Sequence, residues 1–384
     1  MSRRRDRQVL QELLARSVAS TRAIQGPRFS IVIPTFNRAP FVGRAVKSVL
    51  RQMQPGDEVI VVDDGSSDDT PQVLKGFGDR IVALRVARGG AGRARNLGLR
   101  QARNELVAFL DSDDEWLPRK LDIQRAFMAH RPDVLYCFTN FQVEDRRGHI
   151  HHRYLDRWPR EHQTWEEALG PAQAFSSLAP LPDGLYDFSV FAGDLYRWQL
   201  TGLYVLTDTL VVRREQAGDA LHFAEDLPTF EDLECFFRLS RQGTAAFLDI
   251  ETVRQRDHAW GRLSQLSALH KLDARIRLLD RHWGADPSFL AEHRRLYRNT
   301  LQRLEEQRLR ALLACGMNQE ARQALARLER QPWYLELLAR LPVSLSLLAL
   351  QLQRTARRDR LPRLRTAGRV VRHAVGSTRP QPAL

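Results

Sequence analysis

The stretch Glu105-Leu-Val-Ala-Phe-Leu-Asp-Ser-Asp-Asp-Glu-Trp116 is an apolar run that ends directly in several carboxylates. The apolar part has the length and composition of a buried β-strand, and the carboxylates begin at Asp111. Carboxylate oxygens are hard ligands suited to Mg²⁺ or Mn²⁺, and such ions commonly bridge one or two protein carboxylates to substrate phosphates. The alternative is a solvated acidic turn whose side chains cap the next helix.

Apolar runs alternate with helical patterns on both sides of this stretch. The expected strands are 29–33, 58–62, 81–86 and 105–110, and the expected helices are about 39–52, 91–102 and two that begin near 70 and 118. Strands that are apolar throughout and alternate with helices indicate a mainly parallel sheet with helices on both faces. In such a Rossmann-like α/β fold, ligands bind beyond the carboxyl ends of the strands, where Asp111 and its neighbours lie.

Two other turns follow strands of the expected sheet. Val61-Val-Asp-Asp-Gly-Ser-Ser-Asp-Asp-Thr70 offers carboxylates to a base or a ribose, although ordinary strand-to-helix turns use the same residue types. Arg88-Gly-Gly-Ala-Gly-Arg-Ala-Arg-Asn-Leu-Gly98 offers backbone amides and arginines to a diphosphate. It has Arg95 where a dinucleotide fingerprint has its last glycine, and it lacks the Lys-Ser/Thr of a P-loop, so neither of those motifs is indicated.

The chain of 384 residues has a formal net charge of +13, which indicates an acidic partner. Nucleic acid, a phosphate-bearing substrate and an anionic membrane surface all fit that charge. The arginines gather at the two ends, while the acidic clusters along the expected binding edge argue against a nucleic-acid groove there. Three cysteines without CxxC spacing argue against a disulfide framework or a zinc site and fit a reducing cytosol.

No targeting or membrane-spanning segment is expected from the sequence. The basic N-terminus is not followed by the continuous apolar region of a secretory signal. The most apolar late stretch, 341–352, contains Pro342 and is shorter than the ~20 residues that a spanning helix needs. We therefore expect a cytoplasmic protein.

Several of these segments together resemble glycosyltransferase family 2, the inverting enzymes with a GT-A fold. The segments that carry the resemblance are Ile33-Pro-Thr-Phe-Asn-Arg38, Val62-Asp-Asp-Gly-Ser66, Ala94-Arg-Asn-Leu-Gly98 and Asp111-Ser-Asp113, which is similar to the family's DxD metal motif. The resemblance covers roughly residues 29–265 and is weak between about 145 and 200, a stretch rich in aromatic residues and prolines. That gap obscures the acceptor.

The resemblance implies a donor site and a divalent cation. The implied nucleotide-sugar-binding residues are Pro34, Thr35, Asn37, Asp63, Asp64, Arg95, Asp111 and Ser112. The implied cofactor is Mn²⁺ or Mg²⁺, held by Asp111 and Asp113 and joined by His258, which lies in a segment similar to the one that closes the site in many members. A lone histidine is also a common surface or packing residue.

The resemblance continues at Thr229-Phe-Glu-Asp-Leu-Glu-Cys-Phe-Phe-Arg238, which is similar to the family's ED segment. It makes Asp232 the candidate catalytic base, with Glu231 as an acceptor contact or as the base itself. Inverting transfer needs one carboxylate to take the proton of the acceptor hydroxyl as that oxygen attacks the anomeric carbon. The alternative is an acidic pair that the helix dipole stabilises at a helix N-terminus.

The expected organisation follows from these patterns. We expect a polar helical leader over 1–28, a GT-A domain over 29–265, a helical region over 266–375 and a disordered tail over 376–384. Within the GT-A domain, residues about 29–140 form the nucleotide-donor half and 141–265 the acceptor half. In the acceptor half, residues 203–212 are expected to form a strand and residues around 232–241 a helix.

The expected function is transfer of a sugar from a nucleotide-diphosphate sugar, with UDP as the family expectation, to a hydroxyl of a glycan or lipid-linked acceptor in cell-surface synthesis. A metal-dependent nucleotidyltransferase and a basic nucleic-acid-binding protein are the alternatives. The stretch from Trp333 to Leu352 with the arginines behind it has the composition to lie on an anionic membrane, which gives a peripheral location at the inner face. A packed helix pair with a solvated basic tail is the alternative for that region.

Overall fold

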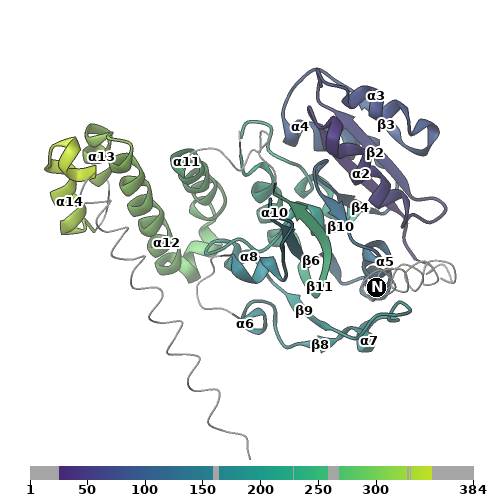
Figure 1. Cartoon of the computed structure of the whole chain (residues 1–384). Helices are drawn as coiled ribbons and strands as arrows, with labels where there is room; N and C mark the ends of the chain where they lie inside the picture. The colour runs from purple at the N-terminus through teal and green to yellow at the C-terminus, as the bar shows by residue number, and fades with distance from the viewer. Residues whose placement is uncertain are drawn as a thin grey trace, which may run out of the picture. The chain divides into compact units, whose positions relative to one another are not determined.

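The computed structural model describes residues 26–158, 164–227, 229–257, 268–326, 328 and 330–347 (Figure 1). The chain divides into two compact units, Met1–Gln265 and Leu266–Leu384, which are considered separately. Most of the expected leader and the whole of the expected tail lie outside the described residues.

Four parallel strands form one side of the sheet in the first unit. They are β1 (Phe29–Thr35), β2 (Glu58–Asp63), β3 (Val82–Arg85) and β4 (Leu106–Phe109), in the order β3-β2-β1-β4. The helices between them are α2 (Ala39–Leu50), α3 (Thr70–Lys75) and α4 (Ala91–Gln101). Prolines in the first turns of α2 and α3 favour helix starts there, because the missing N–H has no intrahelical partner at that position. The strand-helix alternation expected from the sequence is confirmed.

The other side of the sheet is mixed. β10 (Val211–Arg213) runs antiparallel between β4 and β6 (Val134–Glu144), and β6 pairs in parallel with the long strand β11 (Thr244–Arg256). The sheet ends with the antiparallel strands β9 (Ser189–Gly193) and β8 (Gln173–Ala174), while the short strands β5 (Glu115–Trp116) and β7 (Ile150–His151) pair with β11 and β6. The fold is therefore an α/β fold in which the side formed by β1 to β4 is parallel.

Short helices fill the connections of this second half. The α-helices are α5 (Lys120–His130), α6 (Trp165–Leu169), α7 (Phe175–Leu178), α8 (Tyr196–Gln199), α9 (Arg214–Ala217) and α10 (Glu231–Gln242), and the 3₁₀ turns of the unit are η1 (Gly78–Arg80), η2 (Tyr154–Arg157), η3 (Thr207–Thr209) and η4 (Gly218–Ala220). The expected strand at 203–212 is wrong over most of its length, because 207–209 form η3 and the strand begins only at Val211. The helix expected near 232–241 is confirmed as α10.

The core of this unit lies around β1, β2 and β4. All seven residues of β1 and all four of β4 are buried, as expected for strands covered on both faces. Helix α4 packs against β1 and β2. The close approach depends on Gly98, since a Cβ there would overlap the side chain of Val32.

The second unit is helical, as the sequence predicts. It contains α11 (Ala268–Leu279), the π-helical segment η6 (Asp280–Gly284), α12 (Pro287–Ala314), α13 (Asn318–Leu325) and α14 (Trp333–Arg340). Leucines and alanines of α12, α13 and α14 form its buried core. Within the part of the chain that the structure describes, no helix is both long enough and apolar enough to cross a membrane.

Candidate active site

Three neighbouring strands end at one pocket. β2, β1 and β4 are adjacent and parallel, so their carboxyl ends meet at the same edge of the sheet. The pocket at this edge has a volume of about 1020 Å³. Residues predicted from the sequence that line it are Pro34, Thr35, Asn37, Asp64, Arg95, Asp111, Ser112 and Asp113.

The β1 end of the pocket combines an aromatic ring with an unsatisfied hydroxyl. Thr35 is buried, and its Oγ1 has no hydrogen-bond partner among the described residues. Next to it, the ring of Phe36 lies under the guanidinium of Arg88, 4.3 Å from Cζ to the ring centroid. A buried hydroxyl without a partner costs free energy unless a ligand or water satisfies it.

Asp63 and Asp64 occupy different surroundings. Both carboxylate oxygens of Asp64 accept backbone hydrogen bonds, from Gly89 (2.7 Å) and Gly90 (2.8 Å), so Asp64 holds the glycine loop that begins α4. Asp63 turns into its own loop, where Oδ1 accepts the Ser66 amide at 2.9 Å. Asp63 is not among the residues that line the pocket.

The turns after β1 and β2 are tied together by Asn37. Its side-chain Oδ1 accepts a hydrogen bond from the backbone amide of Ser67 at 2.8 Å, and its backbone amide donates to Ser66 Oγ at 2.9 Å. Asn37 adopts a positive φ of 50°, which asparagine tolerates better than most residues. The backbone and side chain of Asn37 therefore both hold this wall of the pocket in place.

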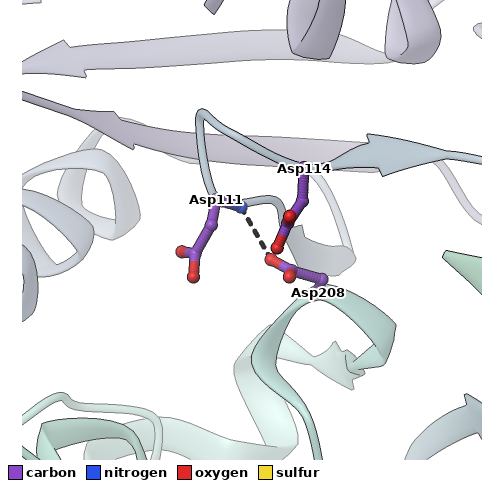
Figure 2. Close-up of side chains that lie close together, drawn as sticks. All are labelled: Asp111, Asp114 and Asp208. Carbon is purple, nitrogen blue, oxygen red and sulfur yellow. Dashed lines mark hydrogen bonds between the residues drawn. The ribbon is translucent and has the colours of Figure 1, made fainter. Parts of the chain in front are cut away.

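Carboxylates converge in the loop that follows β4 (Figure 2). Oxygens of Asp111, Asp114 and Asp208 all lie within 4.8 Å of one another. Asp208 comes from η3, and its Oδ1 accepts the backbone amide of Asp111 at 2.6 Å. Figure 2 shows the carboxylates of Asp114 and Asp208 facing each other. The carboxylate of Asp113, in contrast, accepts a bond from Arg38 Nε at 3.3 Å.

The Asp114 and Asp208 pair is electrostatically unusual. Burial, followed by the charge of Asp113, raises the pKa of Asp114 to about 7. Burial and the charges of Asp111 and Asp114 raise the pKa of Asp208 well above its ordinary value. Two buried carboxylates this close either share a proton or need a cation to compensate their charges. The oxygen donors and their spacing fit a hard divalent cation.

Arg95 joins this loop to α10. Its guanidinium donates to Asp111 Oδ1 at 2.6 Å and to Glu231 Oε1 at 2.8 Å, and it stacks 5.1 Å from the ring centroid of Phe223. Burial alone would lower the pKa of Arg95, but Asp111 and Glu231 raise it overall. Arg95 therefore stays charged and forms ion pairs with both carboxylates.

The two carboxylates at the start of α10 differ in their partners. Glu231 is buried against Arg95, while Asp232 is partly exposed and accepts a bond from Thr207 Oγ1 at 3.0 Å. Burial and the charge of Glu231 raise the pKa of Asp232 to about 6. Asp232 is thus the more accessible of the pair, and its pKa is raised.

Sequence reasoning missed Thr207 and Asp208, and it assigned no role to Asn96. The amide of Asn96 bonds the backbone of Phe223 in both directions, at 2.8 and 2.9 Å, and so ties α4 to the segment before α10. Asn96 belongs to a motif that was visible in the sequence, whereas Asp208 has no local signal. His258 lies outside the described residues.

The first unit is thus an α/β domain with an acidic pocket at its strand ends. Residues 30–192 match the family model for Glycosyl transferase family 2. The match covers less than half of the chain. The Glu231 and Asp232 pair lies beyond the matched residues.

Named relatives agree with this family. TuaG of Bacillus subtilis, a glycosyltransferase assigned to teichuronic acid biosynthesis, is 35% identical over 147 residues, which are 37% of this chain and 57% of TuaG. The Escherichia coli protein WfgD, named as a UDP-Glc:alpha-D-GlcNAc-diphosphoundecaprenol beta-1,3-glucosyltransferase, is 35% identical over 117 residues, 30% of this chain and 46% of WfgD. The matches thus span only about half the length of these relatives.

A solved structure of S. aureus TarS residues 1–349 with UDP-GlcNAc aligns with 77% of this chain and 88% of that chain, at 18% identity and a TM-score of 0.47. The α/β fold of this chain is defined by its own strand order.

Proposed function

We propose that this protein is an inverting, metal-dependent glycosyltransferase that takes a sugar from a UDP-sugar and transfers it to a hydroxyl of a lipid-linked or polymeric cell-surface glycan. The observation that carries the proposal is the link through Arg95 between the carboxylate loop at the donor pocket and the acidic pair of α10. A glycosyl transfer site needs both parts: groups that hold the donor diphosphate and a base for the acceptor.

The donor would lie across the three strand ends. Phe36 and Arg88 offer a stacking surface for the base, and the Thr35 hydroxyl and the Asp64 loop lie beside them. Asp111 and Ser112 line the same pocket after β4, where the diphosphate would lie. The remaining predicted donor contacts, Pro34 and Asn37, stay predictions. Asp63 also stays a predicted donor contact, but its position outside the pocket lining does not support that role.

The cation would be Mn²⁺ or Mg²⁺, held by Asp111 with Asp114 and Asp208 behind it. Their oxygens are the hard donors that these ions prefer, and the Oδ2 atom of Asp208 is buried without a hydrogen-bond partner among the described residues. When bound, such an ion offsets the charge that grows on the leaving diphosphate. Asp113, which lies against Arg38, and His258 remain predicted ligands.

Asp232 is the base in this proposal. It accepts the proton of the acceptor hydroxyl while the oxygen forms its bond to the anomeric carbon and the bond from that carbon to the diphosphate breaks. A pKa of about 6 leaves Asp232 ionised at neutral pH and still more basic than an ordinary aspartate. The ion pair with Arg95 occupies Glu231, which in turn orients the guanidinium of Arg95. This favours Asp232 over Glu231 as the catalytic base.

The alternatives draw less support. A nucleotidyltransferase would share the pocket and the carboxylates, but the family match and the named relatives are glycosyltransferases. A nucleic-acid groove along this edge would meet Asp64, Asp111 and Asp113, whose charges repel phosphate.

Incubation with a panel of UDP-sugars and a polyprenyl-diphosphate-linked sugar as acceptor, in the presence of Mn²⁺, tests the proposal. Mass spectrometry should detect an added sugar, and NMR of the product should show an inverted anomeric centre. Release of pyrophosphate from a nucleoside triphosphate, with no sugar transfer, would instead establish the nucleotidyltransferase.

We also propose that the second unit associates with an anionic membrane surface. Trp333 and Leu337 lie one turn apart on α14 with 75% and 54% of their surface exposed, and Val343 and Leu345 are exposed just beyond. In the sequence, residues 354–379 then contain nine arginines and one acidic residue. Exposed aromatic and aliphatic side chains next to a basic segment suit a bilayer with anionic headgroups.

Co-sedimentation of the full chain with lipid vesicles tests this association. Binding to phosphatidylglycerol-containing vesicles should exceed binding to pure phosphatidylcholine, fall with salt, and weaken in a Trp333→Ser, Leu337→Ser variant. Equal recovery with both vesicle types, or none, would contradict the proposal.

A further inference from the structure

One turn of 3₁₀ helix, η3, contacts both halves of the candidate site. Asp208 accepts a hydrogen bond from the backbone amide of Asp111 at 2.6 Å, and the preceding residue, Thr207, donates to Asp232 Oδ2 at 3.0 Å. Asp208 is fully buried and Thr207 nearly so. Two adjacent side chains therefore reach the donor loop in one direction and the candidate base in the other.

The same turn is fastened to the segment that follows the donor loop. Trp116 Nε1 donates to the carbonyl of Asp208 at 3.0 Å. Gln124 Nε2 and Lys120 Nζ both donate to the carbonyl of Thr209, at 2.9 and 3.2 Å. These three donors are buried, so their hydrogen bonds hold η3 rigidly against β5 and α5.

We propose that Thr207 and Asp208 are positioning residues: Asp208 fixes the backbone of Asp111 at the donor site, and Thr207 fixes the carboxylate of Asp232. This inference rests on the proposed function and adds to it the element that sets the spacing between donor and base. A short turn suits this task because the contacts to the two groups come from neighbouring residues, with no flexible chain between them.

The effect of the hydrogen bond that Asp208 accepts can be distinguished from the effect of its charge. Asp208→Asn keeps an oxygen that accepts the Asp111 amide but removes the negative charge, whereas Asp208→Ala removes both. Because Asp208 also belongs to the proposed cation site, the asparagine variant should bind UDP with Mn²⁺ more weakly than wild type and is the reference for the hydrogen bond. If Asp208 also acts by positioning, the alanine variant should bind about tenfold more weakly than the asparagine variant in calorimetry, as expected for loss of a hydrogen bond of this kind.

Thr207 is tested through the base. Thr207→Val removes the hydroxyl that helps to lower the pKa of Asp232, and Thr207→Ser keeps it. Glu231, Arg95 and Asp111 are the other charged groups that act on Asp232, and neither variant changes them. The valine variant should lose about tenfold in kcat with its acidic pH limb moved to higher pH and UDP affinity unchanged, and the serine variant should restore both.

The possible outcomes distinguish failure of the proposed function from failure of the positioning role. Wild-type protein that binds no UDP with Mn²⁺ would refute the proposed function itself. Wild-type binding and transfer with unchanged behaviour of the alanine and valine variants would refute the positioning role alone. An asparagine variant as weak as alanine would also overturn it, because Asp208 would then act by charge. If Asp208→Ala does not fold, the comparison of Thr207→Val with Thr207→Ser still tests the positioning role of the turn.

Discussion

Arg95 and Glu231 form a buried ion pair, 2.8 Å between Nη1 and Oε1, across 136 residues of sequence. The pair joins the helix that follows the glycine loop to the helix that carries the candidate base. The other arm of the same guanidinium binds Asp111. The buried charge of Arg95 therefore compensates carboxylates from both halves of the site.

Replacement of Arg95 should therefore cost both stability and donor binding. Arg95→Met leaves Glu231 buried without its partner, and we expect a loss of about 3–5 kcal/mol in the free energy of unfolding, measured by chemical denaturation. Arg95→Lys keeps a charge but not the two-armed geometry, so it should fall between. Arg100→Met, exposed on the same helix, is the control and should change stability by less than about 0.5 kcal/mol. Similar losses in all three variants would refute the bridging role.

Replacement of the two acidic residues at the start of α10 should have different effects, one on catalysis and the other on stability. Asp232→Asn should lower kcat by roughly 10²–10⁴-fold, as for a lost general base, while UDP affinity stays unchanged. Glu231→Gln should instead lower stability, since it breaks the pair with Arg95. Full activity of the Asp232→Asn variant, with loss only in Glu231→Gln, would assign the base to Glu231.

The pH dependence follows from Asp232. A base with a pKa of about 6 must be ionised to act, so kcat/KM should rise with pH through about 6 and not near the ordinary aspartate value of about 4. The folded-state pKa lies above the unfolded one, so this residue's contribution to stability is present below about pH 4 and is lost as the pH rises through about 6. A rate profile with its acidic limb near pH 4 would show that Asp232 is not the titrating base.

Gly92 should not tolerate a side chain. A Cβ at Gly92 would overlap the carbonyl oxygen of Ala224, which is backbone and cannot rotate away. Gly92→Ala should therefore destabilise the protein by about 1–3 kcal/mol in thermal or chemical unfolding. Gly43→Ala on α2 is the matched control: its Cβ meets only Val73 Cγ1 at 3.4 Å, so it should be neutral or stabilise by about 0.5–1 kcal/mol. Equal effects of the two changes would contradict the close packing at Gly92.

The parallel half of the fold was predictable because each of its elements has a local signal. β1, β2 and β4 are short apolar runs that end in polar turns, and prolines mark the starts of α2 and α3. From that alternation alone, Thr35, Asp64 and Asp111 could be expected at one edge of the sheet. The antiparallel insertion of β10 has no such signal, since its three residues, Val211–Arg213, are too few to form a distinctive pattern.

The site was predictable in its parts but not in its connections. Residues 203–212 contain Leu, Tyr, Val and Thr, which favour a strand, and that pattern hid the turn that carries Asp208. The turn forms because tertiary contacts from Trp116, Lys120 and Gln124 hold its carbonyls, and those partners lie about 90 residues away. The contact between Asp113 and Arg38 likewise depends on the folded loop and not on local sequence.

The most direct measurement is calorimetric titration of the full chain with UDP, with and without Mn²⁺, on wild type and on Asp111→Asn. The account predicts UDP binding that requires Mn²⁺ in wild type and is lost in a variant that still melts as a folded protein. Folded wild-type protein that binds neither UDP nor any other nucleoside diphosphate under these conditions would contradict the donor site, and with it the proposed function.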